Sequence, residues 1–140
     1  MKNNYQWLSD MLGKPWRAYA TGENVEGVEA WDCWGVVVHA FYQLHGVALD
    51  RHLDIPTKSP RSFVRVVAQE ITSGHWRQIS HQKHGCVVLL ATATRFHHIG
   101  IWLDINGGRL LHSTEGVGVA LDSSAHLSNY NLVEYWEYVG

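Results

Sequence analysis

The second half of the chain alternates short apolar runs with turn-forming residues, and this pattern predicts a β-sheet. After Gly74 the runs are rich in valine, isoleucine, leucine, tryptophan and tyrosine, and clusters of glycine, asparagine and serine separate them. The strands we expect are His75–Ser80, Cys86–Thr92, His97–Asp104, Arg109–Ser113, Gly118–Leu121 and Leu132–Val139. Short strands at this spacing are typical of an antiparallel sheet.

The first half of the chain carries helical patterns instead. Residues Asn4–Met11 predict a short helix, which Gly13 and Pro15 end. The apolar run Cys33–Leu44 predicts a longer helix, with Gly46 as its stop signal. Valine is a poor helix former, so a buried strand is the alternative for the segment VVVHAF.

Two further segments complete the expected order of elements. Residues 20–30 carry two glycines among small polar residues and predict a loop. A further helix is expected to open at Ser59 and Pro60, because apolar residues then recur at helical spacing. These residues are Phe63, Val66, Val67 and Ile71. Helices first and strands afterwards predict an α+β fold with an antiparallel sheet.

Length and composition favour one domain, residues 1–140. Hydrophobic residues make up 46% of the chain and charged residues 17%, which is enough apolar material for a core and too little charge for a disordered chain. The formal net charge is −2, with only 11 lysines and arginines. This balance excludes the basic surface of a general nucleic-acid-binding protein.

The N-terminal segment MKNNYQWLSDML lacks the apolar core of a signal peptide. No run of about 18 apolar residues predicts a membrane span. We therefore expect synthesis in the cytoplasm, where the two cysteines of the chain stay reduced. A disulfide between Cys33 and Cys86 is the alternative.

Cys33, in the stretch WDCWG, is the first candidate for chemistry. In the first turn of a helix, unpaired N–H groups and the helix dipole lower the pKa of a thiol. Asp32 suits the N-cap, but its charge opposes a thiolate, which gives it a structural or substrate-facing role. The alternative is that Cys33 fills the core as a small hydrophobe, the role expected for Cys86 in the apolar run GCVVLLA.

A catalytic cysteine needs a base, and the base needs a third group that orients it. His98 alternates with aliphatic residues in HIGIWL, so we expect it to point away from the aliphatic face, beside Gly100. His97 is the competing base, and alternation places it on the apolar face.

The hairpin after His98 decides whether a second histidine joins it. A two-residue turn would place His112 on the opposite face of the sheet. A three-residue loop over residues 105–107 pairs Asp104 with Gly108. His112 then lies diagonal to His98 on the same face, about 7–8 Å away at the backbone, within reach of two imidazole rings. We predict the three-residue register.

A metal site is the rival to thiol chemistry. His81 and His84, with Cys86 or His97 nearby, could bind zinc. The spacing is loose and a second pair of cysteines is missing, so we expect no metal and no cofactor.

Three segments together resemble the NlpC/P60 family of cysteine peptidases, which act on bacterial cell-wall peptides. GKPW at Gly13–Trp16, followed by DCWG at Asp32–Gly35, is similar to the opening and nucleophile motifs of the family. The tryptophan in DCWG is similar to the variant of this motif in the phage-tail branch of the family. HIGIWL at His98–Leu103 is similar to the strand with the histidine, and RLLHS at Arg109–Ser113 to the strand with the third polar residue. One departure is Gly85-Cys86, where the family often has Gly-Asp.

The resemblance implies a papain-like α+β fold, with the nucleophile at a helix N-terminus packed on an antiparallel sheet. It implies that Cys33 is the nucleophile and His98 the general base, and that His112 orients His98. The substrate contacts we expect are Asp32, Trp34 and Tyr19, with burial in the core as the alternative for Trp34.

The implied reaction is hydrolysis of an amide bond in a peptidoglycan stem peptide. The more specific expectation is the bond between D-glutamate and a diamino acid. Phage-tail proteins are the expected partners, and a virion tail acting at the bacterial cell wall is the expected location. The alternatives are a non-catalytic tail assembly or binding module, and an acyltransferase or amidase of the same architecture.

Overall fold

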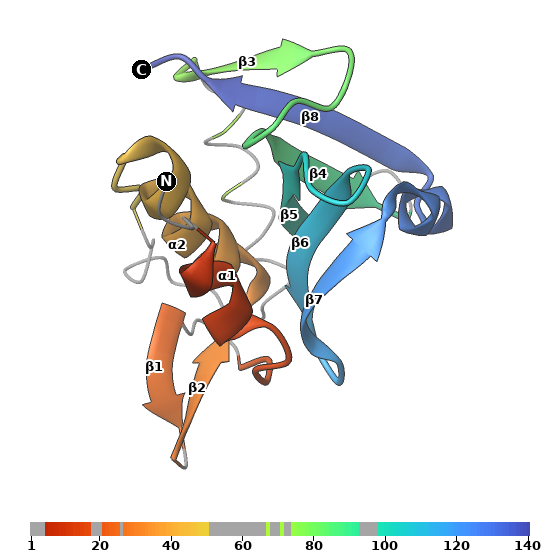
Figure 1. The fold of residues 1–140 in the computed structure, drawn as a ribbon. Coiled ribbons are helices and arrows are strands. Elements are labelled where there is room, and N and C mark those ends of the chain that lie inside the picture. The colour runs from red at the N-terminus through yellow and green to blue at the C-terminus, as the bar shows by residue number, and fades with distance from the viewer. Residues whose placement is uncertain are drawn as a thin grey trace.

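A six-stranded antiparallel sheet forms the centre of the structure (Figure 1). The computed structural model describes residues 5–17, 21–25, 27–50, 67, 71, 74–92 and 98–140. The strands lie in the order β3-β8-β4-β5-β6-β7. Their bounds are β3 Trp76–Ile79, β4 Val87–Ala91, β5 His98–Leu103, β6 Arg109–Thr114, β7 Gly118–Ser123 and β8 Leu132–Tyr138. All of the predicted strands are confirmed, with ends that differ by one or two residues.

Helix α2, Cys33–His45, packs against β5 and β6 on one face of this sheet. The side chain of Asp32 caps its start, because Oδ1 accepts a hydrogen bond from the N–H of Gly35 at 2.6 Å. Gly46 ends the helix in the left-handed conformation, with φ at 69°. The predicted helix is confirmed, and the alternative of a strand over this segment is wrong.

Packing holds α2 together in spite of its valines. Val36 and Val37 are fully buried and belong to one apolar cluster with Ile99 and Ile101 of β5. Because a β-branched side chain costs less than about 1 kcal/mol of helix propensity, burial of even one valine outweighs that cost. The tertiary contact with the sheet therefore decides the local structure.

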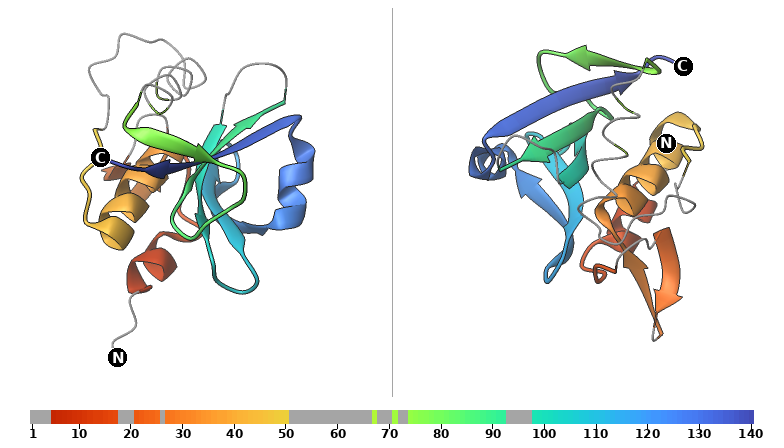
Figure 2. Two further views of the ribbon diagram at one scale, coloured as in Figure 1. Left: turned by 90° about the horizontal axis from the view of Figure 1, so that it is seen from above. Right: turned by 180° about the vertical axis from the view of Figure 1, so that it is seen from behind.

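The opposite face of the sheet is covered as well. A 3-10 helix, η1 at Ser124–Asn129, and strand β8 cover a second apolar cluster that includes Trp102. Figure 2 shows α2 and η1 on opposite sides of the sheet. The aliphatic face of β5 packs on the core, as predicted, but the face that carries His98 is also buried, at 7% exposure for His98 itself.

The loop predicted for residues 20–30 is wrong, because this segment forms a β-hairpin. Strand β1, Thr21–Val25, pairs antiparallel with β2, Val28–Trp31. The glycines that suggested a loop serve the hairpin instead. Gly22 lies against the Trp31 indole, where a Cβ would come within 2.8 Å of the ring, and Gly27 takes a positive φ of 83° at the turn.

The hairpin between β5 and β6 has the predicted register. Leu103 pairs with Arg109, which corresponds to the three-residue loop over residues 105–107. The N–H of Gly108 donates to the carbonyl of Ile105 at 2.9 Å and closes that loop. Continuing the register places Gly100 opposite His112, and a Cβ on Gly100 would lie 2.9 Å from the carbonyl oxygen of Leu111. The absence of a side chain at Gly100 thus makes room for β6 beside it.

The remaining helical predictions are met in part. Helix α1 spans Gln6–Met11, and Asn4, the predicted start, lies outside the described residues. Of the helix predicted to open at Ser59, only Val67 and Ile71 are described, and both have helical backbone and buried side chains. The helix η1 was not predicted. No helix in the described part of the chain is long and apolar enough to span a membrane.

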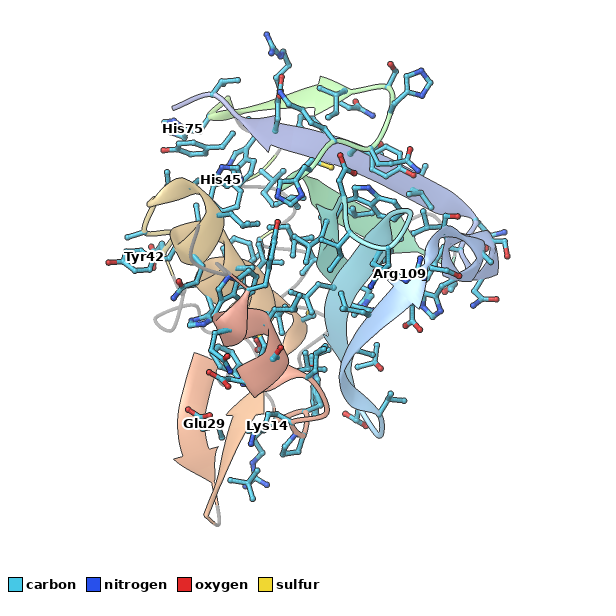
Figure 3. The ribbon with its side chains drawn as sticks, viewed as in Figure 1. Lys14, Glu29, Tyr42, His45, His75 and Arg109 are labelled. Atoms are coloured by element: carbon cyan, nitrogen blue, oxygen red, sulfur yellow. The ribbon has the colours of Figure 1, made fainter. Side chains whose placement is uncertain are left out.

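The far end of α2 is tied to the sheet as well. His45, in the last turn of the helix, reaches toward the end of the sheet where β3 and β8 lie (Figure 3). Its Nε2 lies 3.1 Å from the carbonyl oxygen of Gly85, just before β4. The helix is therefore held by its N-cap, its apolar face and its final turn, which fixes the position of its first residue, Cys33.

We expect Asp32→Ala to destabilise the protein by about 1–2 kcal/mol, because Gly35 loses its acceptor at the helix start. Asp32→Asn keeps a capping oxygen without the charge and is expected to stay within about 0.5 kcal/mol of the wild type. Urea denaturation followed by circular dichroism measures both changes. Equal destabilisation by the two variants would mean that the carboxylate charge, and not the cap, holds the helix start.

Candidate active site

The thiol of Cys33 lies against the start of β5. Its side chain is only 7% exposed. The backbone N–H groups of Ile99, the residue after His98, and of Trp34, in the first turn of α2, favour the charged form of the sulfur. The prediction that Cys33 begins a helix is confirmed, and this helix start brings the thiol to the strand that carries His98.

Burial dominates the acidity of this thiol. Burial, together with the neighbouring Asp32 carboxylate, raises the pKa of Cys33 to about 12. The backbone N–H groups lower the pKa, as expected at a helix start, but they do not offset the loss of water. At neutral pH the thiol therefore keeps its proton until a base removes it.

His98 and His112 meet on one face of the sheet, as predicted. Nε2 of His98 lies 2.7 Å from Nδ1 of His112, and the two rings meet edge to face, with an angle of 62° between them. Both side chains are buried. The predicted hairpin register is the cause of this contact, because a slip by one residue would turn His112 to the other face.

Asp122, on β7, extends the line of polar groups. Its Oδ2 lies 2.6 Å from Nε2 of His112. Burial lowers the pKa of His112, and the hydrogen bond and charge of Asp122 oppose that shift without reversing it. His112 is therefore neutral at neutral pH, and its one ring proton is available for one of its two hydrogen bonds.

The family of the chain follows from comparison with known proteins. Residues 13–137 match the model of the NlpC/P60 family. This chain belongs to the NlpC/P60 family. Its fold is similar to that of the NlpC/P60 domain of the peptidoglycan hydrolase SagA, with a TM-score of 0.52 and 18% identity over 96% of this chain and 98% of that one. No curated protein matches the chain.

The family match and the fold agree with the α+β architecture predicted for an NlpC/P60 protein, with Cys33 at a helix N-terminus on an antiparallel sheet. At 18% identity the likeness to the SagA domain shows the fold alone. The roles of individual side chains therefore have to be argued from their own geometry.

The line of three groups selects one tautomer of each histidine. The Asp122 carboxylate only accepts hydrogen bonds, so neutral His112 must place its proton on Nε2. Nδ1 of His112 then carries a lone pair and accepts the proton on Nε2 of His98. Neutral His98 is left with a lone pair on Nδ1, the nitrogen that does not contact His112. This lone pair can take the proton of a thiol.

Two side chains from the segment after β7 pack against the line His98–His112–Asp122, which we call the histidine relay. The ring of Tyr130 stacks on His98, with centroids 6.3 Å apart and an angle of 11° between the rings. Burial raises the pKa of the Tyr130 hydroxyl, and the charge of Asp122 raises it further, so Tyr130 stays protonated at neutral pH. His126 of η1 packs edge-on against His112 at a centroid distance of 4.9 Å.

Sequence reasoning missed Asp122, although a signal for it existed. In the pairing of β6 with β7, His112 lies opposite Ala120, so Asp122 is its diagonal neighbour on the same face. The same diagonal rule predicted the contact between His112 and His98. Asp122 was overlooked because the predicted strand ended at Leu121, the residue before Asp122, whereas β7 continues to Ser123.

The structure describes two of the three predicted substrate contacts. Asp32 is buried and caps α2, and Trp34 is 3% exposed, with its indole N–H donating to the carbonyl of Asp50 at 2.9 Å. Both placements favour structural roles over contact with a substrate. Tyr19 lies outside the described residues.

The other cysteine takes no part in this site. Cys86 is buried in the second apolar cluster, as predicted, and burial raises the pKa of its thiol to about 11. Both cysteines are free, so the alternative of a Cys33–Cys86 disulfide is wrong. The alternative zinc site also finds no support, because His81, His84 and Cys86 do not form a ligand group in the described part of the chain. His97 lies outside that part.

If Asp122 sets the tautomers, Asp122→Asn should slow the alkylation of Cys33 by iodoacetamide more than Asp122→Ala does. The asparagine N–H₂ donates to Nε2 of His112 and forces the opposite tautomer of both histidines. A wrong tautomer lowers kcat about 10⁴-fold when the asparagine amide contacts the catalytic base directly. We expect at least about 10-fold here, where one further histidine intervenes.

Mass spectrometry of the peptide that contains Cys33 gives the alkylation rate, and urea denaturation provides the control for folding. A purely structural role for Asp122 predicts the reverse order, since asparagine is the closer match in shape. A slower reaction for Asp122→Ala than for Asp122→Asn would therefore exclude tautomer selection.

Proposed function

We propose that this protein is a cysteine peptidase that hydrolyses an amide bond in bacterial peptidoglycan stem peptides. The observation that carries the proposal is the hydrogen-bonded line from His98 through His112 to Asp122, which begins on β5, the strand against which α2 and its first residue, Cys33, pack. A nucleophile, a base and groups that orient the base are the parts that thiol catalysis requires.

The high pKa of Cys33 favours removal of its proton during attack over a permanently charged thiolate. As the sulfur bonds to the substrate carbonyl carbon, the thiol proton moves to Nδ1 of His98. His98 becomes a cation. Neutral His112, which is hydrogen-bonded to Asp122, accepts a hydrogen bond from Nε2–H of His98 and so stabilises this cation. Backbone N–H groups in the first turn of α2 are suited to stabilise the oxyanion.

The tetrahedral intermediate then breaks down to a thioester. His98 gives its Nδ1 proton to the leaving amine, and the C–N bond breaks. In the second half of the reaction, His98 takes a proton from water, whose oxygen attacks the thioester carbonyl. The thiolate leaves, recovers the proton from His98, and the acid product is released.

Membership of the NlpC/P60 family and the fold shared with a domain of a peptidoglycan hydrolase support the substrate class. Within that class we propose the bond between D-glutamate and a diamino acid. The sequence DCWG further suggests an association with phage-tail proteins. In that case the protein is made in the cytoplasm and delivered to the cell wall by the tail.

We expect Cys33→Ala to abolish the release of new peptides from purified sacculi, with a loss of at least about 10³-fold, because the nucleophile is removed. His98→Ala is expected to cause a loss of the same order. Cys86→Ala is the matched control, since this second buried thiol lies in the other apolar cluster, and it should retain most activity. Liquid chromatography with mass spectrometry of the digested muropeptides measures all of these effects.

The products also separate the proposed activity from the alternatives. Free carboxylate ends on the stem peptide indicate hydrolysis, whereas transfer to an added amine indicates an acyltransferase. Identical muropeptides from wild type and Cys33→Ala, with sacculi of both Gram-negative and Gram-positive bacteria, would reject the peptidase and leave an assembly or binding module.

A further inference from the structure

Three potential metal ligands converge on the outer end of the histidine relay. They are Nε2 of His112, Oδ2 of Asp122 and Nδ1 of His126, and all three atoms lie within 4.8 Å of one another. Nε2 of His112 is 2.6 Å from Oδ2, and Nδ1 of His126 is 3.8 Å from the same oxygen. The ligands come from three consecutive elements, β6, β7 and η1.

The donor set suits zinc. Two imidazole nitrogens and one carboxylate oxygen form a common zinc site with an open fourth position. In a tetrahedral site with bonds of about 2.0–2.1 Å, neighbouring ligand atoms lie about 3.4 Å apart. The observed separations of 2.6 and 3.8 Å lie on either side of that value. The third pair, Nε2 of His112 and Nδ1 of His126, lies within 4.8 Å. Entry of an ion therefore requires Asp122 and His112 to separate by less than about 1 Å, with His126 adjusting to the same ion.

A solvent ion can reach these groups. The side chain of Asp122 is 40% exposed and that of His126 is 28% exposed, while His112 is buried behind them. The cluster thus opens outward, on the far side of His112 from His98. Cys33 is not a member of this group.

We propose that His112, Asp122 and His126 form an inhibitory Zn²⁺ site, which prevents His98 from acting as a base by reversing the tautomers of the relay. The inhibitory role rests on the proposed peptidase function, whereas the metal site itself does not. The nearby thiol and His98 are not ligands in this site, which distinguishes it from direct capture of the metal by the nucleophile.

The reversal follows from the placement of the protons. Zinc binds the lone pair of Nε2 of His112, so this atom can no longer carry a proton. The one proton of the neutral ring therefore moves to Nδ1. Nδ1–H then donates to Nε2 of His98, which must carry a lone pair. The proton of neutral His98 is placed on Nδ1, the position that has to accept the thiol proton. Each ring carries one proton before and after zinc binds. His98 no longer acts as a base, because its Nδ1 has lost the lone pair that accepts the thiol proton.

Binding is tested first in Cys33→Ala, which removes the thiol as a ligand. Isothermal titration with Zn²⁺ at pH 7 should show one site in this variant. Adding His126→Gln is expected to weaken binding by at least about 10-fold, because one ligand is lost. Adding His81→Gln provides the matched control, since His81 is an exposed histidine outside the cluster, and it should leave affinity unchanged.

Reactivity is tested next in proteins that retain Cys33. Zn²⁺ should slow alkylation of Cys33 by iodoacetamide in the wild type and in His81→Gln. In His126→Gln the zinc concentration that halves the rate, measured against the zinc-free rate of the same variant, should rise at least about 10-fold. His126→Asn serves as a second variant, and circular dichroism verifies that each protein is folded.

The outcomes separate the site from the proposed function. Loss of zinc binding in Cys33→Ala, or equal affinity with and without His126, overturns the site. Binding that leaves the alkylation rate unchanged overturns the tautomer mechanism. If muropeptides are not cleaved, the peptidase proposal fails, but the titration and the alkylation rates still decide whether the metal site exists and acts on Cys33.

Discussion

The register of one hairpin supports the whole candidate site. A three-residue loop between β5 and β6 places His112 on the same face as His98, and the next hairpin places Asp122 beside His112. Because strand side chains alternate with a period of two, a shift by one residue in either hairpin would separate these groups completely. The geometry of the candidate site is therefore a property of turns that lie far from the thiol in sequence.

Helix α2 imposes the second constraint, since it must both pack on the sheet and present its first residue. The valines that make it a poor isolated helix are the side chains that attach it to β5. The same attachment removes water from Cys33 and raises the pKa of its thiol. A favourable helix start is thus not sufficient to lower the pKa of a buried cysteine, and ionisation of such a thiol requires a separate proton acceptor.

Much of this arrangement could be predicted from the sequence, and the failures have physical causes. The strands, helix α2 and the contact between His98 and His112 follow from alternation, capping residues and loop length, all of which are local. The hairpin over residues 21–31 was missed because Gly22 is required by the Trp31 ring and not by a loop, which is a tertiary fact. Tyr130 and His126 were missed because η1 has no apolar period of its own.

The burial of Cys33 also has a consequence for redox chemistry. Oxidation of cysteine to sulfenic acid and beyond proceeds through an exposed thiolate. A sulfur that is 7% exposed, with a pKa of about 12, offers neither the charge nor the access that peroxide requires. If Cys33 is the nucleophile proposed above and loses its proton only during attack on a substrate, it survives in surroundings that would inactivate a permanently ionised cysteine.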